Sequence, residues 1–326
     1  MTSSILASNQ KRLVIVSGRA HHGLAEEVAE LLNTHVLPTT AYDFANGETF
    51  VRYEESVRGV DAFVIQSHAA GINNWVMEQL LMCDALKRAS AKRITVVAPF
   101  FPYARQDKKH KGREPISARL MTDLFKAAGA DRLMSVDLHT PQIQGFFDGP
   151  VDHLWALPLL ADYIGGKYAT EELTVVSPDS GRVRVADIWA ERLGTPLAII
   201  HKRRDPDKPN QVEAHELVGE VAGRTCMLVD DMIDTGGTIV AAAKALKANG
   251  AKRVIVAATH AVFSNPAVER LSSGAVDEVV VTNTLPITPD KEFAQLTVLS
   301  IAPLIAEAIK AVFDDDSVAK LFPGHA

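Results

Sequence analysis

One stretch of this sequence decides the fold, and it reads CMLVDDMIDTGGT at residues 226–238. Residues 225–229 are an apolar run that predicts a buried strand, and this run leads directly into the carboxylates of Asp230 and Asp231. A glycine-rich turn follows, and then an apolar-periodic segment that predicts a helix over residues 238–248. A strand, a turn and a helix in this order form the repeating unit of an α/β protein with a parallel sheet.

The turn over residues 234–238 has the composition of an anion-binding site. Its members after Asp234 are two hydroxyl residues and two glycines, Thr235, Gly236, Gly237 and Thr238. Backbone N–H groups at a helix N-terminus lack intrahelical partners, and glycine lets the backbone approach a ligand closely. The carboxylates of Asp230 and Asp234 would repel a phosphate but accept hydrogen bonds from sugar hydroxyls, so we predict a phosphorylated sugar as the ligand. A structural turn without a ligand remains the alternative, although so many acids and glycines in one turn are poor for stability alone.

Length and composition indicate a globular protein of two domains. The chain has 326 residues, of which 47% are hydrophobic and 23% charged, and it carries a net charge of −6. The acidic balance disfavours a nucleic-acid partner or an anionic membrane. No apolar run approaches membrane-spanning length and the N-terminus does not resemble a signal peptide, so we expect a cytoplasmic protein. Cys83 and Cys226 have no partner at metal-ligand spacing, and we expect both to be buried thiols.

Short apolar segments alternate with amphipathic ones along the whole chain. Strands are predicted at residues 13–17, 62–67, 94–98, 133–136, 173–177, 197–200, 225–229, 254–258 and 279–281. Continuous Val, Ile and Leu strands separated by helices predict mostly parallel sheets with helices on both faces. We expect two similar domains, residues 1–154 and 155–312, with the terminal helix and the tail 313–326 as segments that can pack on the first.

A long loop between a strand and a helix is the second informative segment. It reads PFFPYARQDKKHKGREPIS at residues 99–117. Ligands of open α/β sheets bind at the carboxyl ends of the strands, where this loop is expected to lie. Aromatic residues close to Arg and Lys suit a purine base with a polyphosphate tail. A solvated basic loop is one alternative, and a nucleic-acid patch is disfavoured because no second basic stripe appears.

Several motifs together resemble the class I ribose-phosphate diphosphokinases, a family of phosphoribosyltransferase-like fold. The turn at 234–238 is similar to the loop that grips the phosphate and ribose of phosphoribosyl diphosphate in proteins of that fold. Residues 105–109 and 115–118 are similar to the adenylate-binding segment of the family. The other matching motifs are at residues 44–48, 136–139, 142–148, 177–179 and 283–286. The resemblance runs collinearly from about Arg12 to the C-terminus, and its variants look most like those of actinobacterial members.

The resemblance implies transfer of the diphosphoryl group of Mg-ATP to the anomeric hydroxyl of ribose 5-phosphate. The products would be AMP and 5-phosphoribosyl 1-diphosphate, the precursor for nucleotide, histidine and tryptophan synthesis. Mg²⁺ would be the cofactor, and His139 and Asp179 match the positions of the metal site. Lys202 and Arg204 match the catalytic cations. From the residues alone, a structural His139 and a solvated charge run at 202–204 remain open.

The same resemblance assigns two sets of binding residues. The positions expected to bind ATP are Phe44, Asn46, Gly47, Glu48, Arg105 and Gln106. The positions expected to bind ribose 5-phosphate are Arg204, Asp230, Asp234, Thr235, Gly236, Gly237 and Thr238. Without the resemblance, the sequence around Asn46 and Gly47 favours an ordinary turn between two strands.

Regulation and assembly are also implied by the family. Its members form homo-oligomers, commonly hexamers, which phosphate activates and ADP inhibits at a separate interface site. The matching positions are Ser56, Arg58, Arg113 and Ser317. Two other functions remain open at this point, namely a phosphoribosyltransferase that consumes phosphoribosyl diphosphate and a non-catalytic regulatory homologue.

Overall fold

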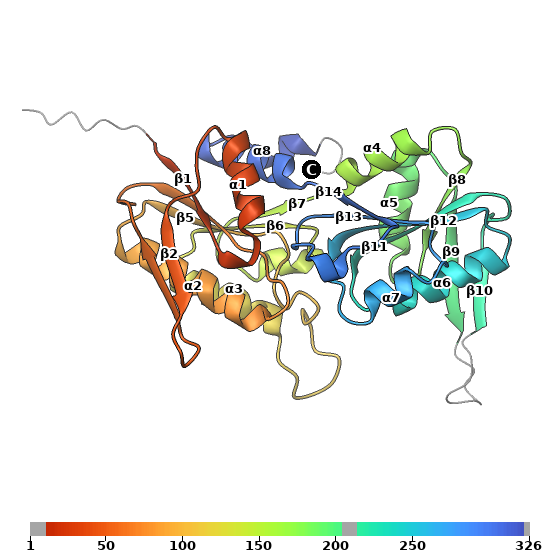
Figure 1. Ribbon diagram of the computed structural model, residues 1–326, viewed down its shortest axis with the longest axis horizontal. Coiled ribbons are helices and arrows are strands. Elements are labelled where there is room, and N and C mark those ends of the chain that lie inside the picture. Colours follow the sequence, from red (N-terminus) through yellow and green to blue (C-terminus); the bar gives the residue numbers. More distant parts are fainter. Residues whose placement is uncertain (1–10, 204–213, 323–326) are drawn as a thin grey trace, which may run out of the picture. The chain divides into compact units, whose positions relative to one another are not determined.

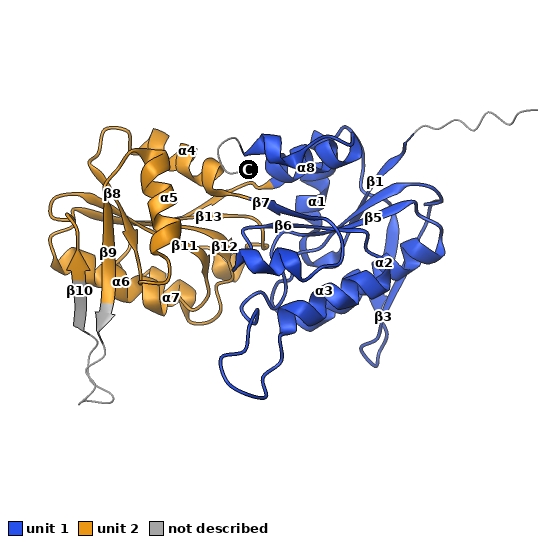
Figure 2. Cartoon of the chain, turned by 180° about the vertical axis from the view of Figure 1, so that it is seen from behind, with its two compact units in different colours: residues 1–154, 302–326 blue, residues 155–301 orange. Residues whose placement is uncertain are grey.

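The chain folds into two compact units (Figure 2). The computed structural model describes residues 11–203 and 214–322, without the side chains of residues 202, 203 and 214–216. Unit 1 contains residues 1–154 and 302–326, and unit 2 contains residues 155–301. Residues 302–312, which the sequence-based division assigned to the second domain, belong to unit 1 because the helix that they form packs there.

Unit 1 is built on a five-stranded parallel sheet in the order β1-β4-β5-β6-β7. Its strands are β1 (Leu13–Ser17), β4 (Asp61–Ile65), β5 (Arg93–Ala98), β6 (Arg132–Val136) and β7 (Val151–Leu154). Every residue of β4 is buried, as expected for a strand that is covered on both faces. The runs of Val, Ile and Leu identified in the sequence thus form the centre of the sheet.

Two pairs of helices cover this sheet (Figure 1). They are α1 (His22–Leu31), α2 (Ile72–Arg88), α3 (Ser117–Ala128) and α8 (Ala302–Phe313). Helix α1 packs against α8, and α2 packs against α3 on the other face. Short 3-10 helices are η1 (Arg19–His21), η2 (Pro141–Gly145) and η4 (Val318–Leu321).

An antiparallel two-stranded ribbon projects from unit 1. Strand β2 (Thr39–Asp43) pairs with β3 (Thr49–Tyr53), so that the loop 44–48 is the tip of a hairpin. Strand β3 packs against α2, and Tyr53 donates from its hydroxyl to the backbone oxygen of Met82 at 2.8 Å. The turn between two strands that the sequence favours is therefore present.

Unit 2 is built on a seven-stranded sheet in the order β10-β9-β8-β11-β12-β13-β14. The strands are β8 (Leu173–Ser177), β9 (Leu197–Arg203), β10 (Ala214–Val218), β11 (Thr225–Ile233), β12 (Arg253–Ala261), β13 (Glu278–Thr282) and β14 (Leu296–Leu299). All neighbours are parallel except β9 and β10. The expected class, mostly parallel sheets flanked by helices in two α/β units, is confirmed.

Helices cover both faces of this second sheet (Figure 1). They are α4 (Leu157–Lys167), α5 (Val183–Leu193), α6 (Gly237–Ala248) and α7 (Ala267–Leu271), with the 3-10 helix η3 (Pro289–Lys291). Helix α4 packs against α5, and α6 packs against α7. Gly194 ends α5 in the left-handed region with φ of 63°, a backbone conformation that glycine adopts without strain.

The interior of each unit is apolar. Cys83 in α2 and Cys226 in β11 are buried and unpaired, as expected, and burial raises the pKa of the Cys226 thiol to about 11. None of the helices in the described part of the chain combines the length and the apolar composition needed to cross a membrane.

Candidate active site

The two carboxylates that follow the apolar run lie inside a strand. Strand β11 extends to Ile233, whereas the sequence predicted that it ends at residue 229. Its ladder with β12 continues to the end of the strand, because β12 is equally long, but its ladder with β8 ends at Leu228. Asp230 and Asp231 therefore have a strand neighbour on one side only, beside the loop that follows β8.

That loop supplies a cation to both carboxylates. Arg182, at the N-terminus of α5, forms ion pairs with Asp230 (Nε to Oδ1, 3.1 Å) and with Asp231 through Nη2. The backbone N–H of Asp231 also donates to Oδ1 of Asp230 at 2.9 Å. The side chain of Arg182 thus fixes the position of two acids that would otherwise repel each other.

The ionised form of Asp230 is nevertheless unfavourable in the folded protein. Burial, and then the like charge of Asp231, raise the pKa of Asp230 to about 8, while Arg182 opposes this shift. A ligand that donates hydrogen bonds to Asp230 would favour the ionised form of its carboxylate. Hydroxyl groups of a sugar are donors of this kind.

The turn after β11 joins the strand to α6 as the sequence predicted. Gly236 has φ of 69°, and helix α6 begins at the next residue, Gly237. The N-cap residue of α6 is Gly236, which has no side chain to cap the helix, so the first backbone N–H groups of α6 have no cap from this position. Arg270 in α7 donates from Nη1 to the backbone oxygen of Thr235 at 3.0 Å, and this hydrogen bond stabilises the turn.

Three neighbouring strands of unit 2 end at this place. Strands β9, β8 and β11 are adjacent and parallel, and their carboxyl ends carry Lys202, Asp179 and the 234–238 turn. Oδ1 of Asp179 accepts from the backbone N–H groups of Gly181 (2.8 Å) and Arg182 (3.1 Å). Ligands of α/β sheets bind at this edge. The side chain of Lys202 and the whole of Arg204 lie outside the described part of the chain.

Unit 1 has a corresponding edge, which carries Arg105, Gln106 and His139. The loop 99–116 follows β5, and His139 follows the adjacent strand β6. The buried carboxylate of Asp107 ties the two loops together, because it accepts from Thr140 Oγ1 at 2.9 Å and from Gln142 Nε2 at 2.6 Å. Arg105 and Gln106 are exposed, and Gln106 accepts from Ser117 Oγ at 2.5 Å.

The remaining positions expected to bind ATP form the tip of the hairpin. The backbone N–H of Phe44 donates to the oxygen of Glu48 at 2.8 Å, and Asn46 Oδ1 accepts from the N–H of Glu48 at 3.2 Å. Gly47 adopts φ of 87°, and Phe44 is 45% exposed beside Tyr42. The tip is therefore an ordered turn that presents an aromatic ring to the solvent.

The predicted metal positions lie in different units, with His139 in unit 1 and Asp179 in unit 2. Within residues 11–203 and 214–322, no group of three or more His, Cys, Asp or Glu side chains could hold a metal ion. The four positions expected to bind regulators, Ser56, Arg58, Arg113 and Ser317, are all exposed and lie in unit 1. Their roles stay predictions.

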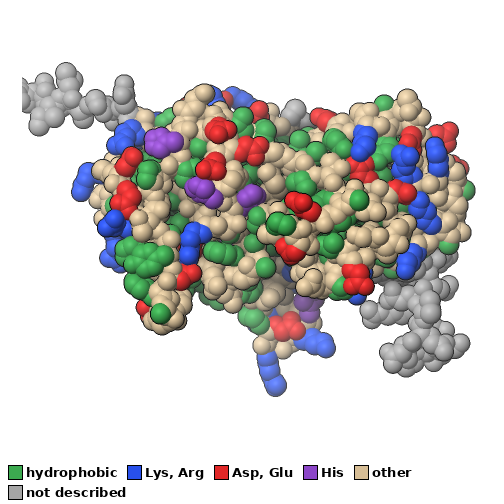
Figure 3. All heavy atoms as spheres, viewed as in Figure 1, with side chains coloured by type: hydrophobic (Ala, Val, Ile, Leu, Met, Phe, Trp, Pro, Cys, Tyr) green, Lys and Arg blue, Asp and Glu red, His purple; other side chains and the backbone are tan. Residues whose placement is uncertain are grey.

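A hollow of about 960 Å³ on unit 1 contains none of the predicted site residues. It lies between α1 and the hairpin, and its ionisable lining consists of Arg19, two histidines (His22 and His35) and three glutamates, Glu26, Glu30 and Glu54. On the face shown in Figure 3, histidine side chains gather among acidic ones over unit 1. Because the glutamates of this lining outnumber its one arginine and both predicted substrates are anionic, we do not assign either substrate to this hollow.

The fold is that of an α/β protein with its conspicuous loops at the carboxyl ends of the strands, where such proteins bind ligands, and comparison with known proteins gives the family. A model of the N-terminal domain of ribose phosphate pyrophosphokinase matches residues 13–129, and a model of the phosphoribosyl synthetase-associated domain matches residues 207–323. A ribose-phosphate pyrophosphokinase of Streptomyces coelicolor is 66% identical over 320 residues, which are 98% of this chain and 99% of that protein. One of Mycobacterium tuberculosis is 63% identical over 98% of each chain.

A solved structure agrees with these relatives. The crystal structure of phosphoribosylpyrophosphate synthetase from Mycobacterium smegmatis has a TM-score of 0.89 and 63% identity, and the match covers 94% of this chain and 100% of that one. This chain belongs to the ribose-phosphate pyrophosphokinase family. The expected family and its actinobacterial character are confirmed.

Three arginines with structural contacts near these loops, Arg19, Arg182 and Arg270, have no role that the sequence predicts. Arg182 pairs with the acids of β11, Arg270 braces the turn, and Arg19 contacts the hairpin. Their partners are far away in the sequence, so no local spacing marks them. An excess of acids at 230–234 was the one available hint that a cation from elsewhere must be close.

Proposed function

We propose that this chain forms 5-phosphoribosyl 1-diphosphate and AMP from ATP and ribose 5-phosphate. The observation that carries this proposal is 66% identity over 98% of the chain to a protein named ribose-phosphate pyrophosphokinase. The arrangement at the end of β11 supports it independently. There, the open N-terminus of α6 suits a phosphate and the carboxylates suit hydroxyl groups.

The reaction is a displacement at the β-phosphorus of ATP. The anomeric oxygen of ribose 5-phosphate forms a bond to this phosphorus, and the bond to the oxygen that bridges to the α-phosphorus breaks. AMP leaves with that oxygen, and the anomeric hydroxyl releases its proton. Little covalent chemistry is required of the protein, so positioning and neutralisation of charge account for the catalysis.

Unit 2 holds the acceptor in this proposal. The backbone N–H groups at Gly236 and Gly237, with the hydroxyls of Thr235 and Thr238, bind the phosphate of ribose 5-phosphate. The carboxylates of Asp230 and Asp234 accept hydrogen bonds from the ribose hydroxyls. The ion pair with Arg182 orients Asp230 for this contact.

Unit 1 holds the donor nucleotide. Phe44 is a ring that can contact adenine, and Asn46, Gly47 and Glu48 supply polar groups from the same tip. Arg105 and Gln106 bind from the loop after β5, which Asp107 keeps in place. Exposure of Arg105 and Phe44 supports these roles, because both side chains are accessible to a ligand.

Lys202 and Arg204 stabilise the negative charge of the migrating diphosphoryl group. Asp179 would hold Mg²⁺, because it offers the carboxylate oxygen that this ion prefers as a ligand. His139, a nitrogen donor, suits contact with a coordinated water or phosphate. When bound, the ion supplies positive charge to the phosphate oxygens.

Two rival functions were open from the sequence, and the family disfavours both. A phosphoribosyltransferase would not need the hairpin tip or the 105–109 segment. A silent homologue would not need Lys202 or the intact 234–238 turn. The curated relatives at 60–66% identity are named pyrophosphokinases.

The decisive assay measures AMP formed from ATP and ribose 5-phosphate with Mg²⁺, against diphosphate released from phosphoribosyl diphosphate and a free base. We expect AMP formation that requires both substrates and the metal. No AMP from correctly folded protein would contradict the proposal.

Assembly and regulation follow from the family resemblance alone. We propose a homo-oligomer, a hexamer as the first expectation, with phosphate as activator and ADP as inhibitor at the site that includes Ser56, Arg58, Arg113 and Ser317. A cytoplasmic location is proposed on the same basis. Sedimentation of the purified protein and AMP assays with and without phosphate test the first two proposals.

A further inference from the structure

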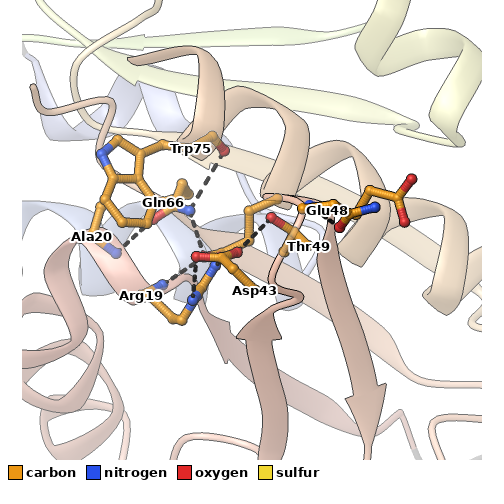
Figure 4. A network of polar contacts seen from close by, with 9 residues as sticks. Arg19, Ala20, Asp43, Glu48, Thr49, Gln66 and Trp75 are labelled. Carbon is orange, nitrogen blue, oxygen red and sulfur yellow. Dashed lines mark hydrogen bonds and ion pairs between the residues drawn. The ribbon is translucent and has the colours of Figure 1, made fainter. Parts of the chain in front are cut away.

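Arg19 connects the interior of unit 1 to the end of strand β2. It is the first residue of η1 and is separated from the end of β1 by Gly18 alone. Its Nε pairs with Glu78 in α2, and its backbone N–H donates to the other carboxylate oxygen of Glu78 at 2.7 Å. The two outer nitrogens of the guanidinium donate to both oxygens of Asp43, at 2.6 and 3.2 Å (Figure 4). One planar side chain therefore holds two carboxylates that belong to different elements.

The inner end of this connection is rigid. The side chain of Glu78 is completely buried, and it also accepts from Gln66 Nε2 at 2.9 Å. Gln66 is buried too, and its oxygen accepts from the N–H of Ala20 at 3.2 Å. Gly18 leaves the space for this amide, because a Cβ there would lie 2.2 Å from the Gln66 side chain. Glu78 is thus a buried carboxylate with several partners, and these contacts fix its position.

The outer end lies at the base of the hairpin tip. Asp43 is the last residue of β2 and is paired with Thr49 across the ladder. Its Oδ1 also accepts from Thr49 Oγ1 at 2.8 Å, so that Asp43 joins both strands where the tip begins. The hydrogen bond from Arg19, and then that from Thr49, lower the pKa of Asp43. Asp43 is therefore a carboxylate at neutral pH, as the contact requires.

The hairpin needs such a contact because of its shape. A two-stranded ribbon is marginally stable alone and can twist or bend. Packing of β3 on α2, including the Tyr53 hydroxyl, holds the end of the ribbon that lies away from the tip. Arg19 contacts the opposite end, immediately before Phe44.

We propose that Arg19 and Asp43 are positioning residues, which hold the tip 44–48 in the orientation that binds ATP. This inference rests on the proposed function, in which the tip contacts the nucleotide. If the tip adopts the binding orientation for only a fraction of the time, the apparent affinity for ATP falls by that fraction. Ribose 5-phosphate binds in unit 2 and is unaffected.

The test replaces Asp43 rather than Arg19, because loss of Arg19 would leave Glu78 buried without its cation. Asp43→Ala in the full-length protein is expected to raise KM for ATP roughly 10-fold, the effect of about 10% occupancy of the binding orientation. KM for ribose 5-phosphate and kcat at saturating ATP are expected to stay within about 2-fold. A purely structural defect would change all three together.

Two further variants make the result specific to the carboxylate. Asp43→Glu keeps the charge and is expected to recover at least half of the lost affinity. Thr49→Val removes only the hydroxyl that supports Asp43, and it should raise KM for ATP by roughly 3–5-fold, less than Asp43→Ala but beyond the 2-fold range of an unaffected constant. If Asp43→Ala does not fold, Thr49→Val still tests whether the contacts of Asp43 orient the tip.

The matched control is Glu54→Ala. Glu54 is an exposed carboxylate that pairs with Arg52 at 2.9 Å and accepts a hydrogen bond from Thr40, a pair of positions at the end of the ribbon away from the tip. The Glu54→Ala variant should keep the KM values of the wild type for ATP and for ribose 5-phosphate. An unchanged KM for ATP in Asp43→Ala, or an equal loss in Asp43→Ala and Asp43→Glu, would overturn the proposal. Absence of AMP formation in the wild type would instead refute the proposed function, so the two failures are distinguishable.

Discussion

The turn after β11 and the tip of the β2–β3 hairpin are both proposed to hold substrate, yet they are supported in different ways. The turn follows β11, the central strand of a seven-stranded sheet, in which residues 226–229 are fully buried. Helix α6 begins directly at this turn. The tip stands at the end of a ribbon in which Tyr42 and Phe44 are exposed. Packing fixes the first loop, whereas an arginine that joins two carboxylates fixes the second.

This difference predicts that the turn after β11 holds its substrate rigidly, whereas the hairpin tip can change its position. A loop set on a packed strand can hold a ligand to within fractions of an ångström, which transfer of a diphosphoryl group requires. A loop held by an exposed ion pair can move when that pair opens. We therefore expect changes near β11 to affect the chemical step or the acceptor, and changes near the hairpin to affect ATP alone.

The largest effect is expected for Lys202→Ala. Lys202 lies on the same sheet as the turn, and loss of a charge that stabilises the transition state lowers turnover by roughly 10²–10³-fold. Single-turnover AMP formation measures this loss, with both KM values expected to stay near those of the wild type. Lys252→Ala, an exposed lysine before the amino end of β12, is the control. Near-normal turnover of Lys202→Ala would show that unit 2 does not supply this charge.

An intermediate effect is expected for Gly236→Ala. The left-handed backbone at φ of 69° costs an alanine about 1–2 kcal/mol, which the turn can relieve only by moving its N–H groups. KM for ribose 5-phosphate should rise roughly 5–30-fold, since each 1.4 kcal/mol is a factor of about ten. KM for ATP should change little.

Gly194→Ala is the matched control for this variant. It has a similar φ of 63° at the end of α5, and an added Cβ would meet no atom within 4 Å. It should lose comparable stability and keep its substrate affinity. Equal effects of the two variants on KM would mean that the turn acts only through stability.

The smallest effect is a pH-dependent change in stability for Asp230→Asn. Because the folded protein raises the pKa of Asp230 to about 8, ionisation of this group destabilises the fold fully above pH 8. As the pH falls from 8 towards 4, the folded state takes up a proton that the unfolded state does not bind, and the penalty disappears. Ligand-free Asp230→Asn should gain roughly 3–8 °C in Tm at pH 8 and clearly less at pH 5.

Thermal unfolding at both pH values measures this difference. Asp187→Asn, which removes an exposed carboxylate of α5, should follow the wild type. A gain for Asp230→Asn that is equal at both pH values would exclude a raised pKa. In that case the gain in stability of Asp230→Asn would not come from the ionisation of Asp230.

The fold class could be predicted from the sequence because each central strand is a continuous apolar run. The strand–turn–helix at 225–248 and the turn around Gly47 are local patterns, and local patterns set their own structure. The end of β11 was predicted too early, because polar residues usually end a strand. Here the long partner β12 extends the ladder past Asp230 and Asp231.

The network around Arg19 could not be predicted in this way. Glu78 and Asp43 are separated from Arg19 by 59 and 24 positions, and each alone resembles a surface residue. Only the packing of α2 against the sheet makes Glu78 a buried charge that needs a cation. The same limit applies to Arg182 and Asp231, which are 49 positions apart.

Helix α8 has a consequence for the order in which the protein acquires its structure. It is made from residues 302–313, yet Ile305 and Ile309 are buried in unit 1, where the helix packs on α1. During translation the whole of unit 2 leaves the ribosome before α8 does. Unit 2, a continuous segment, can therefore fold first, while one face of the unit 1 sheet is covered by α1 without α8 until residues 302–313 are synthesised.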